Sequence, residues 1–328
     1  MNDWVQRVGE LTEEHREQRA KKYAMLGRRR TFKHRVEGFS ETYAKSAAKW
    51  YTDRERGQRE RPARVAACGA EVLQISCLGC GTVNEFRSGC RVALLCFPCR
   101  SVSNAARRRS FRRARAVTIG AARQRGLFNE RRRGGRWSEK FLTLTAPHFS
   151  RQTVAERIEV VLSAWQRFLR LLNGFFASRD VKSAEWFRVF EWTPGKTDNF
   201  GHPHLHIWIF SPFLPRDEIE RWWREALFEQ TNDASVERVI VDIREVHGEG
   251  AEHELIKYLT KDITATGEKV APEIYAQVYI ALDGHRSTQT SRGFMGKGKL
   301  EKRACDCGCA LPRHVRKEKK PAVAGETK

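Results

Sequence analysis

The chain has 328 residues, of which 40% are hydrophobic, so it can bury a sizeable core in one large domain or two smaller ones. Its 61 Lys and Arg residues outnumber its 40 Asp and Glu residues, and the net charge of +21 indicates a polyanionic partner, nucleic acid before anionic membrane. No stretch approaches the roughly 18 apolar residues of a membrane span. The polar start is unlike a signal peptide, so we expect a cytoplasmic protein.

Residues 1–66 are polar and highly charged, which predicts a basic N-terminal arm, either helical or mobile. Trp4, Val5, Val8 and Leu11 indicate a short amphipathic helix at its start. A solvated extension and an arm that contacts nucleic acid both remain open.

Residues 67–105 contain two CxxC pairs that are separated by fifteen residues. Each pair can chelate one side of a tetrahedral Zn²⁺, and in a reducing compartment such clustering favours metal ligation over disulfides. We therefore predict a zinc-ribbon-like module with a structural zinc; unligated thiols are the alternative, and Cys90 could replace one ligand. The predicted ligands are Cys77, Cys80, Cys96 and Cys99.

Residues 106–136 predict an Arg-rich helical segment that binds nucleic acid, since so many unpaired arginines repel one another unless phosphates neutralise them. A second basic tract follows residue 285. The arginines that we expect to contact DNA are Arg107, Arg108, Arg109, Arg112, Arg113, Arg115, Arg131, Arg132, Arg133, Arg286 and Arg292.

Residues 137–300 have the pattern of a compact α+β domain. Strands are predicted at 140–148, 185–195, 202–210 and 236–246, because these stretches are rich in β-branched and aromatic residues and end at turn residues. Apolar residues at helical spacing predict helices at 154–172, 219–227 and 251–263. The order βαββαβ predicts a ferredoxin-like (RRM-like) antiparallel sheet with helices on one face.

The third of these strands contains "HPHLHIWIF", in which side chains alternate between the two faces. Its apolar residues share the face that we expect to pack on the helices, whereas His202, His204 and His206 share the other. Imidazoles at alternate positions are close enough to bind one ion, and Glu191 on the neighbouring strand could complete the site. We predict a divalent metal on His204, His206 and Glu191, with His202 competing for the third place.

The helix at 251–263 has its apolar stripe on one side. Glu254, Tyr258 and Lys261 lie at i, i+4 and i+7, nearly opposite that stripe. A tyrosine retained only for packing would lie among the leucines, so Tyr258 is a candidate functional residue. Tyr275 and Tyr279 are interpreted as core residues.

Taken together, "HLH" at 204–206, "YLTK" at 258–261 and "FLTLT" at 141–145 resemble the motifs of the HUH endonucleases. The resemblance covers about 140–265 and is greatest to the single-tyrosine rolling-circle replication initiators of plasmids. It implies a nickase in which Tyr258 attacks a phosphodiester and remains joined to the 5′ phosphate. Lys261 would hold the phosphate or favour phenolate, and Glu254 would act as the base in the closing step.

The resemblance further implies Mn²⁺ or Mg²⁺ at the histidines, single-stranded or hairpin origin DNA with its flanking duplex as substrate, and the host helicase and polymerase as partners. An HUH transposase or a mobilisation relaxase shares this chemistry and is an alternative. A zinc-ribbon DNA-binding regulator without catalytic activity is another. Residues 301–328, with Cys305, Cys307 and Cys309, predict a basic flexible tail.

Overall fold

The structure is a computed structural model. It describes residues 72–77, 83–87, 89, 97–129, 135–147, 152–181, 184–194, 201–247, 274, 277–278, 281–282, 285–298 and 313–316. The chain divides into two compact units, one formed by Met1–Ser103 with Lys302–Lys328 and the other by Asn104–Glu301. The boundaries expected at 106 and 137 therefore fall inside the second unit. No helix in the described ranges is both long and apolar enough to cross a membrane.

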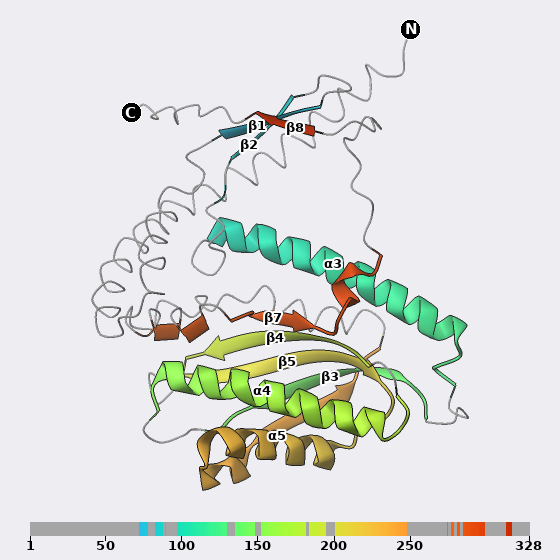
Figure 1. Cartoon of the computed structure of the whole chain (residues 1–328), viewed down its shortest axis with the longest axis vertical. Helices are drawn as coiled ribbons and strands as arrows, with labels where there is room; N and C mark the ends of the chain where they lie inside the picture. Colours follow the sequence, from blue (N-terminus) through green and yellow to red (C-terminus); the bar gives the residue numbers. More distant parts are fainter. Residues whose placement is uncertain are drawn as a thin grey trace. The chain divides into compact units, whose positions relative to one another are not determined.

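The second unit contains a five-stranded antiparallel sheet in the order β6-β3-β5-β4-β7 (Figure 1). Its strands are β3 (Ser138–Thr145), β4 (Glu185–Thr193), β5 (His202–Ser211), β6 (Ile240–Glu245) and β7 (Thr288–Thr290). Helix α4 (Val154–Ala177) joins β3 to β4, and α5 (Arg216–Thr231) joins β5 to β6. The predicted order βαββαβ is confirmed, whereas β7 at the sheet edge was not predicted.

Local signals set the ends of both connecting helices. Thr153 and Glu156 form a capping box at the start of α4, and the hydrogen bonds from Thr153 lower the pKa of Glu156. Helix α5 follows Pro215 and ends at Asn232, whose φ of 50° closes the last turn. These residues therefore determine where α4 begins and where α5 begins and ends.

The predicted strand at 236–246 was wrong at its start. Residues Ala234–Arg238 form a 3₁₀ turn, η1, and the strand begins only at Ile240. The side chain of Asp233 accepts a hydrogen bond from the backbone N–H of Ser235 at 2.7 Å, which favours a turn over an extended chain. Val236 is buried within this turn, so its apolar side chain belongs to the packing of the turn and not to a strand.

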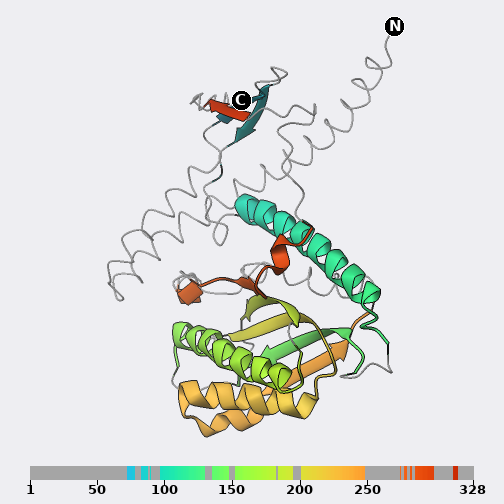
Figure 2. The ribbon, with the colours of Figure 1, turned by 45° about the vertical axis from the view of Figure 1, so that its right-hand side comes forward.

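The sheet has a helix-covered apolar face. Leu205, Ile207 and Ile209 of β5 are buried on the side of α4 and α5, which Figure 2 shows packed together beneath the strands. Trp165 and Phe168 of α4 are buried with them. The predicted alternation along β5 is therefore confirmed: its apolar residues face the two helices, and its histidines lie on the other face.

Helix α3 (Phe97–Gln124) covers part of that other face, which the expectation of helices on one face did not include (Figure 1). Phe111 of α3 packs on Phe187, Trp208 and Phe294, with ring centroids 5.2–6.0 Å apart. This cluster also contains Phe141 and Phe210. On the histidine face, the part of the sheet beyond His206 is therefore covered by an aromatic core, separate from the apolar core beneath α4 and α5.

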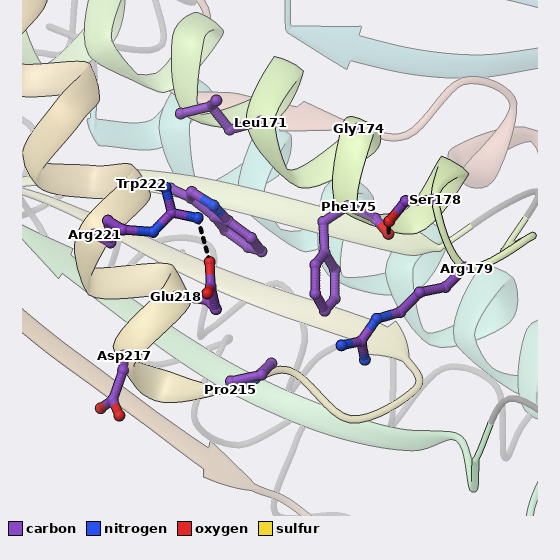
Figure 3. Close-up of a pocket in the computed structure, with 10 residues that line it drawn as sticks. All are labelled: Leu171, Gly174, Phe175, Ser178, Arg179, Pro215, Asp217, Glu218, Arg221 and Trp222. Atoms are coloured by element: carbon purple, nitrogen blue, oxygen red, sulfur yellow. Dashed lines mark hydrogen bonds and ion pairs between the residues drawn. The ribbon is translucent and has the colours of Figure 1, made fainter.

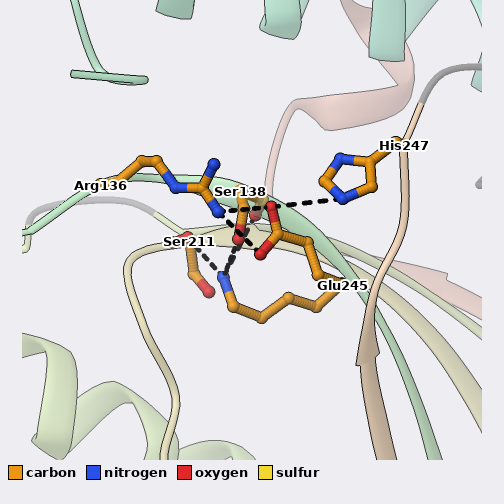
Figure 4. Close-up of polar contacts among 6 residues, drawn as sticks. Arg136, Ser138, Ser211, Glu245 and His247 are labelled. Atoms are coloured by element: carbon orange, nitrogen blue, oxygen red, sulfur yellow. Dashed lines mark hydrogen bonds and ion pairs between the residues drawn. The ribbon is translucent and has the colours of Figure 1, made fainter. Parts of the chain in front are cut away.

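Polar side chains hold the start of β3 (Figure 4). The Lys140 amine donates hydrogen bonds to the Ser138 hydroxyl at 2.9 Å and to the Ser211 carbonyl at 2.8 Å. Lys140 is buried, and burial lowers its pKa from 10.5 to about 8, while nearby Glu245 partly opposes the shift. Arg136 binds both oxygens of Glu245 at 2.8 and 2.9 Å. Together these contacts join the ends of β3, β5 and β6.

The first unit contains a three-stranded antiparallel sheet in the order β2-β1-β8. Its strands are β1 (Val72–Cys77), β2 (Val83–Arg87) and β8 (Arg313–Arg316). The sequence predicts a flexible tail from residue 301, but four of its residues form β8 and pair with β1, with Cys77 opposite Arg313. A four-residue strand is too short to show a periodic pattern in the sequence, and its partner lies more than 230 positions away.

Candidate active site

Two neighbouring strands bring the predicted metal ligands to one face of the sheet. Glu191 on β4 lies directly opposite His204 on β5, and His206 lies two residues further along β5. The ring centroids of His204 and His206 are 6.2 Å apart. The Nε2 atom of His206 lies 2.7 Å from Oε2 of Glu191. The structure therefore brings together the three residues that the sequence selected.

His202 extends the same row. Its ring centroid lies 6.2 Å from that of His204, and the two rings are nearly parallel. It is separated from the Glu191–His206 contact by His204, so Glu191 is better placed than His202 to complete a site with His206.

The opposite side of each central imidazole contacts a threonine. Thr143 and Thr145 on β3 pair in register with His206 and His204, and their hydroxyl oxygens lie 3.2 and 3.1 Å from the respective Nδ1 atoms. Since Nδ1 faces β3, the Nε2 atom of each ring faces β4. There His206 meets Glu191, and His204 lies 3.1 Å from the Thr193 hydroxyl. Both rings thus direct the same nitrogen toward one side.

The site lies at the edge of the buried core. His206 and Glu191 are 4% and 6% exposed, whereas His204 is half-buried. Phe141 stacks on His206 with ring centroids 5.9 Å apart. A closely held imidazole–carboxylate pair at this depth has little water to compete for its donors, which suits metal binding or proton transfer.

The donor types fit a divalent metal, because two imidazoles and one carboxylate lie on the same sheet face, and both Nε2 atoms are directed toward β4. The arrangement is not preformed, since His206 and Glu191 contact each other directly. Accordingly, the described part of the chain contains no ready-made group of three His, Cys, Asp or Glu side chains around a common point.

The predicted catalytic helix lies outside the described residues. This applies to Tyr258, Glu254 and Lys261, as well as to Arg131, Arg132 and Arg133 of the basic segment and to Cys80 and Cys96 of the cysteine module. Of the remaining predicted zinc ligands, Cys77 ends β1, and Cys99 lies in the first turn of α3.

The described arginines of the predicted DNA-binding set have different environments. Arg115 is tied to Glu139 by contacts of 2.5 and 2.7 Å, and Arg107 donates to Asn104 in a part-buried position where burial lowers its pKa. Arg108 and Arg113 are half-buried. Four are exposed: Arg109, Arg112, Arg286 and Arg292.

Sequence reasoning missed the residues that support the site. Thr143 and Thr145 stand in the quoted "FLTLT", but their pairing with the histidines depends on the β3–β5 register, which the sequence does not encode locally. Glu139 was also missed, although it accepts hydrogen bonds from Arg115 and from Nε1 of Trp208 at 2.8 Å. The strict alternation of threonines in β3 with apolar residues was the available signal.

A separate cleft of about 530 Å³ lies between the end of α4 and the start of α5 (Figure 3). Phe175 and Trp222 form its aromatic wall, with ring centroids 5.0 Å apart, and Arg179 lies over Phe175. Because α4 and α5 cover the face opposite the histidines, this cleft is not part of the candidate active site.

Comparison with known proteins agrees with the geometry. A family model described as a replication protein matches residues 103–308, which is more than half of the chain. Searches of curated proteins and of solved structures found no match to the chain. The match contains all five strands of the larger sheet and the paired histidines of β5. The chain therefore belongs to the replication-protein family of rolling-circle plasmids and is an HUH-type initiator of rolling-circle replication.

Proposed function

We propose that this initiator begins replication by nicking one DNA strand in a metal-dependent reaction, with Tyr258 as the nucleophile. The observation that supports this proposal most strongly is the convergence of His204, His206 and Glu191 on one sheet face, with 2.7 Å between His206 and Glu191. Bound at these donors, Mn²⁺ or Mg²⁺ would polarise the scissile phosphate and offset its growing negative charge.

The side chains have distinct tasks in this proposal. The Tyr258 phenol releases its proton, and its oxygen bonds to the phosphorus. The bond from phosphorus to the 3′ oxygen breaks, and the departing oxygen takes up a proton to become a 3′-hydroxyl primer. Because a phenol has a pKa of about 10, Lys261 would favour the phenolate by its positive charge. In the closing step Glu254 would accept a proton from the attacking hydroxyl or water.

We also propose that Cys77, Cys80, Cys96 and Cys99 bind a structural Zn²⁺. Supporting this, one pair begins at the last residue of β1, and the other precedes and enters the first turn of α3, where a thiolate is favoured by the helix dipole. A Cβ added to Gly89 would lie 3.0 Å from the Cys99 sulfur, so the loop after β2 passes close to this thiol. Four thiolates would leave no open position, so this metal would be structural.

A covalent-adduct assay tests the nickase proposal. Wild-type protein with Mn²⁺ should form a stable adduct with single-stranded DNA from its own replicon, and EDTA should prevent it. Tyr258→Phe should bind the DNA without forming an adduct, while the matched control Tyr275→Phe should form it normally. An adduct that survives in Tyr258→Phe would refute the assignment. Binding without cleavage under any metal would instead favour a non-catalytic regulator.

Glu254→Ala separates the two halves of the reaction. This variant should form the adduct at a normal rate but fail to release it, because only the closing step needs the carboxylate as a base. Adduct formation and release are followed in one time course on a labelled strand. Normal release would remove Glu254 from the mechanism.

A further inference from the structure

Helix α3 has two chemically different sides within the larger unit. Phe111, Ala114, Thr118 and Ala122 are buried against the sheet. On this inner side Arg115 is only 18% exposed and is held by Glu139. The outer side instead carries Arg109, Arg112, Ala116 and Arg123, all of which are exposed. The position of the helix on the sheet therefore decides which arginines face outward.

The outer side carries positive charge at both ends and no negative charge. With 100° between successive residues, Arg109, Arg112, Ala116, Gly120 and Arg123 lie within an arc of about 80°. The sequence of α3 contains eight arginines and no acidic residue. The helix itself therefore contributes only positive charge to this side.

On the outer side of α3, arginines lie toward both ends, and the centre between them has no long side chain. Arg109 and Arg112 occupy one turn, and Arg123 follows about 17 Å beyond Arg112 at a rise of about 1.5 Å per residue. Between them the outer side presents Ala116 and Gly120, and a Cβ added to Gly120 would meet nothing within 4 Å. The centre can therefore be approached closely by another molecule, while both ends offer positive charge.

This helix lies on the same face of the sheet as the histidines. Phe111 packs edge-on against Trp208 at 5.4 Å, and Trp208 is the next residue after His206 on that face of β5. Glu139 links Arg115 of α3 to the indole N–H of the same Trp208. A molecule bound to α3 is therefore anchored to the unit that carries the histidines.

We infer that the outer side of α3 is a docking surface for double-stranded DNA, which would hold the duplex beside the nicking site. This inference rests on the proposed function, and it adds that α3 binds the DNA in its double-stranded form. The charge complements a phosphate backbone, and the span between the arginine positions is comparable to a major groove about 12 Å wide with its two bordering backbones. Ala116 and Gly120 have no groups that read base edges, so binding should be independent of sequence.

The test measures duplex binding without cleavage. We compare the full chain with the variant Arg109→Gln/Arg112→Gln/Arg123→Gln, using fluorescence anisotropy with a labelled 20-base-pair duplex of scrambled sequence over a salt series. Loss of three phosphate contacts should reduce the slope of log K against log salt by about 2.7. The control variant Arg170→Gln/Arg179→Gln/Arg216→Gln removes the same charge from exposed positions at α4 and α5 and should keep the wild-type slope.

A second variant tests shape without changing charge. Gly120→Met places a side chain in open space and adds a good helix former, so the fold should be retained. Duplex affinity should nevertheless fall at least tenfold. Equal slopes in all variants, equal losses in the α3 and control variants, or an unchanged affinity for Gly120→Met would each overturn the inference. Because no cleavage is measured, these outcomes do not depend on whether Tyr258 is the nucleophile.

Discussion

At the scale of single residues, the hydroxyls of β3 matter as much as the histidines. An imidazole that binds a metal through Nε2 carries its proton on Nδ1 and must donate it. Thr143 and Thr145 lie 3.2 and 3.1 Å from the two Nδ1 atoms and can accept those protons. They would fix both the tautomer and the ring orientation, which partners of metal-binding histidines commonly do.

Thr145→Val tests this role, because valine keeps the shape and the strand preference but removes the acceptor. We expect Mn²⁺ affinity to fall by about 10- to 100-fold, measured by isothermal titration calorimetry. Thr145→Ser, which restores a hydroxyl, should recover most of the affinity. Thr290→Val on β7, a threonine whose hydroxyl bonds to the Ser291 carbonyl, is the control and should bind as wild type. Wild-type affinity in Thr145→Val would show that the contact is incidental.

Lys140 predicts a specific pH dependence of stability. Burial lowers its pKa to about 8 in the folded chain, whereas the unfolded chain keeps the ordinary 10.5. Between these values the unfolded state binds more protons, so the free energy of unfolding should rise with pH from about 8 to about 10.5. The shift corresponds to a gain of up to about 3 kcal/mol.

Urea unfolding at a series of pH values checks this prediction, with Lys140→Met as the comparison. The difference in unfolding free energy between wild type and Lys140→Met should change across that window in favour of the wild type. A difference that stays constant with pH would mean that Lys140 titrates normally in the folded protein.

At the scale of elements, a single buried carboxylate fastens α3 to the sheet. Glu139 is 7% exposed and accepts hydrogen bonds from two nitrogens of Arg115 and from the indole of Trp208. These bonds and the aromatic contacts of Phe111 act at the same place. The part of α3 from Asn104 onward is therefore packed into the larger unit.

Glu139→Gln should destabilise the protein by about 3 kcal/mol, because the partly buried Arg115 charge would lose its counter-ion. The matched control is Glu218→Gln, which breaks the exposed pair of Glu218 with Arg221 and should cost less than about 1 kcal/mol. Both values come from urea unfolding followed by tryptophan fluorescence. Equal effects of the two substitutions would show that the Glu139 contact contributes no more than a surface pair.

At the scale of the whole molecule, the periodicity of apolar and polar residues predicted the features that neighbouring residues determine. It missed the features that depend on contacts between distant parts of the chain. The alternation in "HPHLHIWIF" placed the histidines on the correct face, and the spacing of apolar residues located α4 and α5. The Glu191–His204 pairing followed from a hairpin, in which neighbouring strands are close in sequence. These features need no knowledge of distant contacts.

Distant pairing explains what the sequence did not reveal. Strand β7 has three residues and exists only because it pairs with β4, about 100 residues earlier. The threonine partners of the histidines lie about 60 residues before them, and Arg115 meets Glu139 only after the chain turns back from α3 into β3. The arginine-rich pattern likewise gave the charge of α3 but not which of its sides is buried.

The most direct test of the whole account is to map the covalent product by peptide mass spectrometry. Single-stranded DNA from the replicon is incubated with the wild-type chain and Mn²⁺, and the protein is digested with a protease and a nuclease. The account predicts a 5′-phosphate-linked nucleotide on the peptide that contains Tyr258, and its absence in His206→Ala. A linked nucleotide on any other residue, or an undiminished yield in His206→Ala, would contradict it.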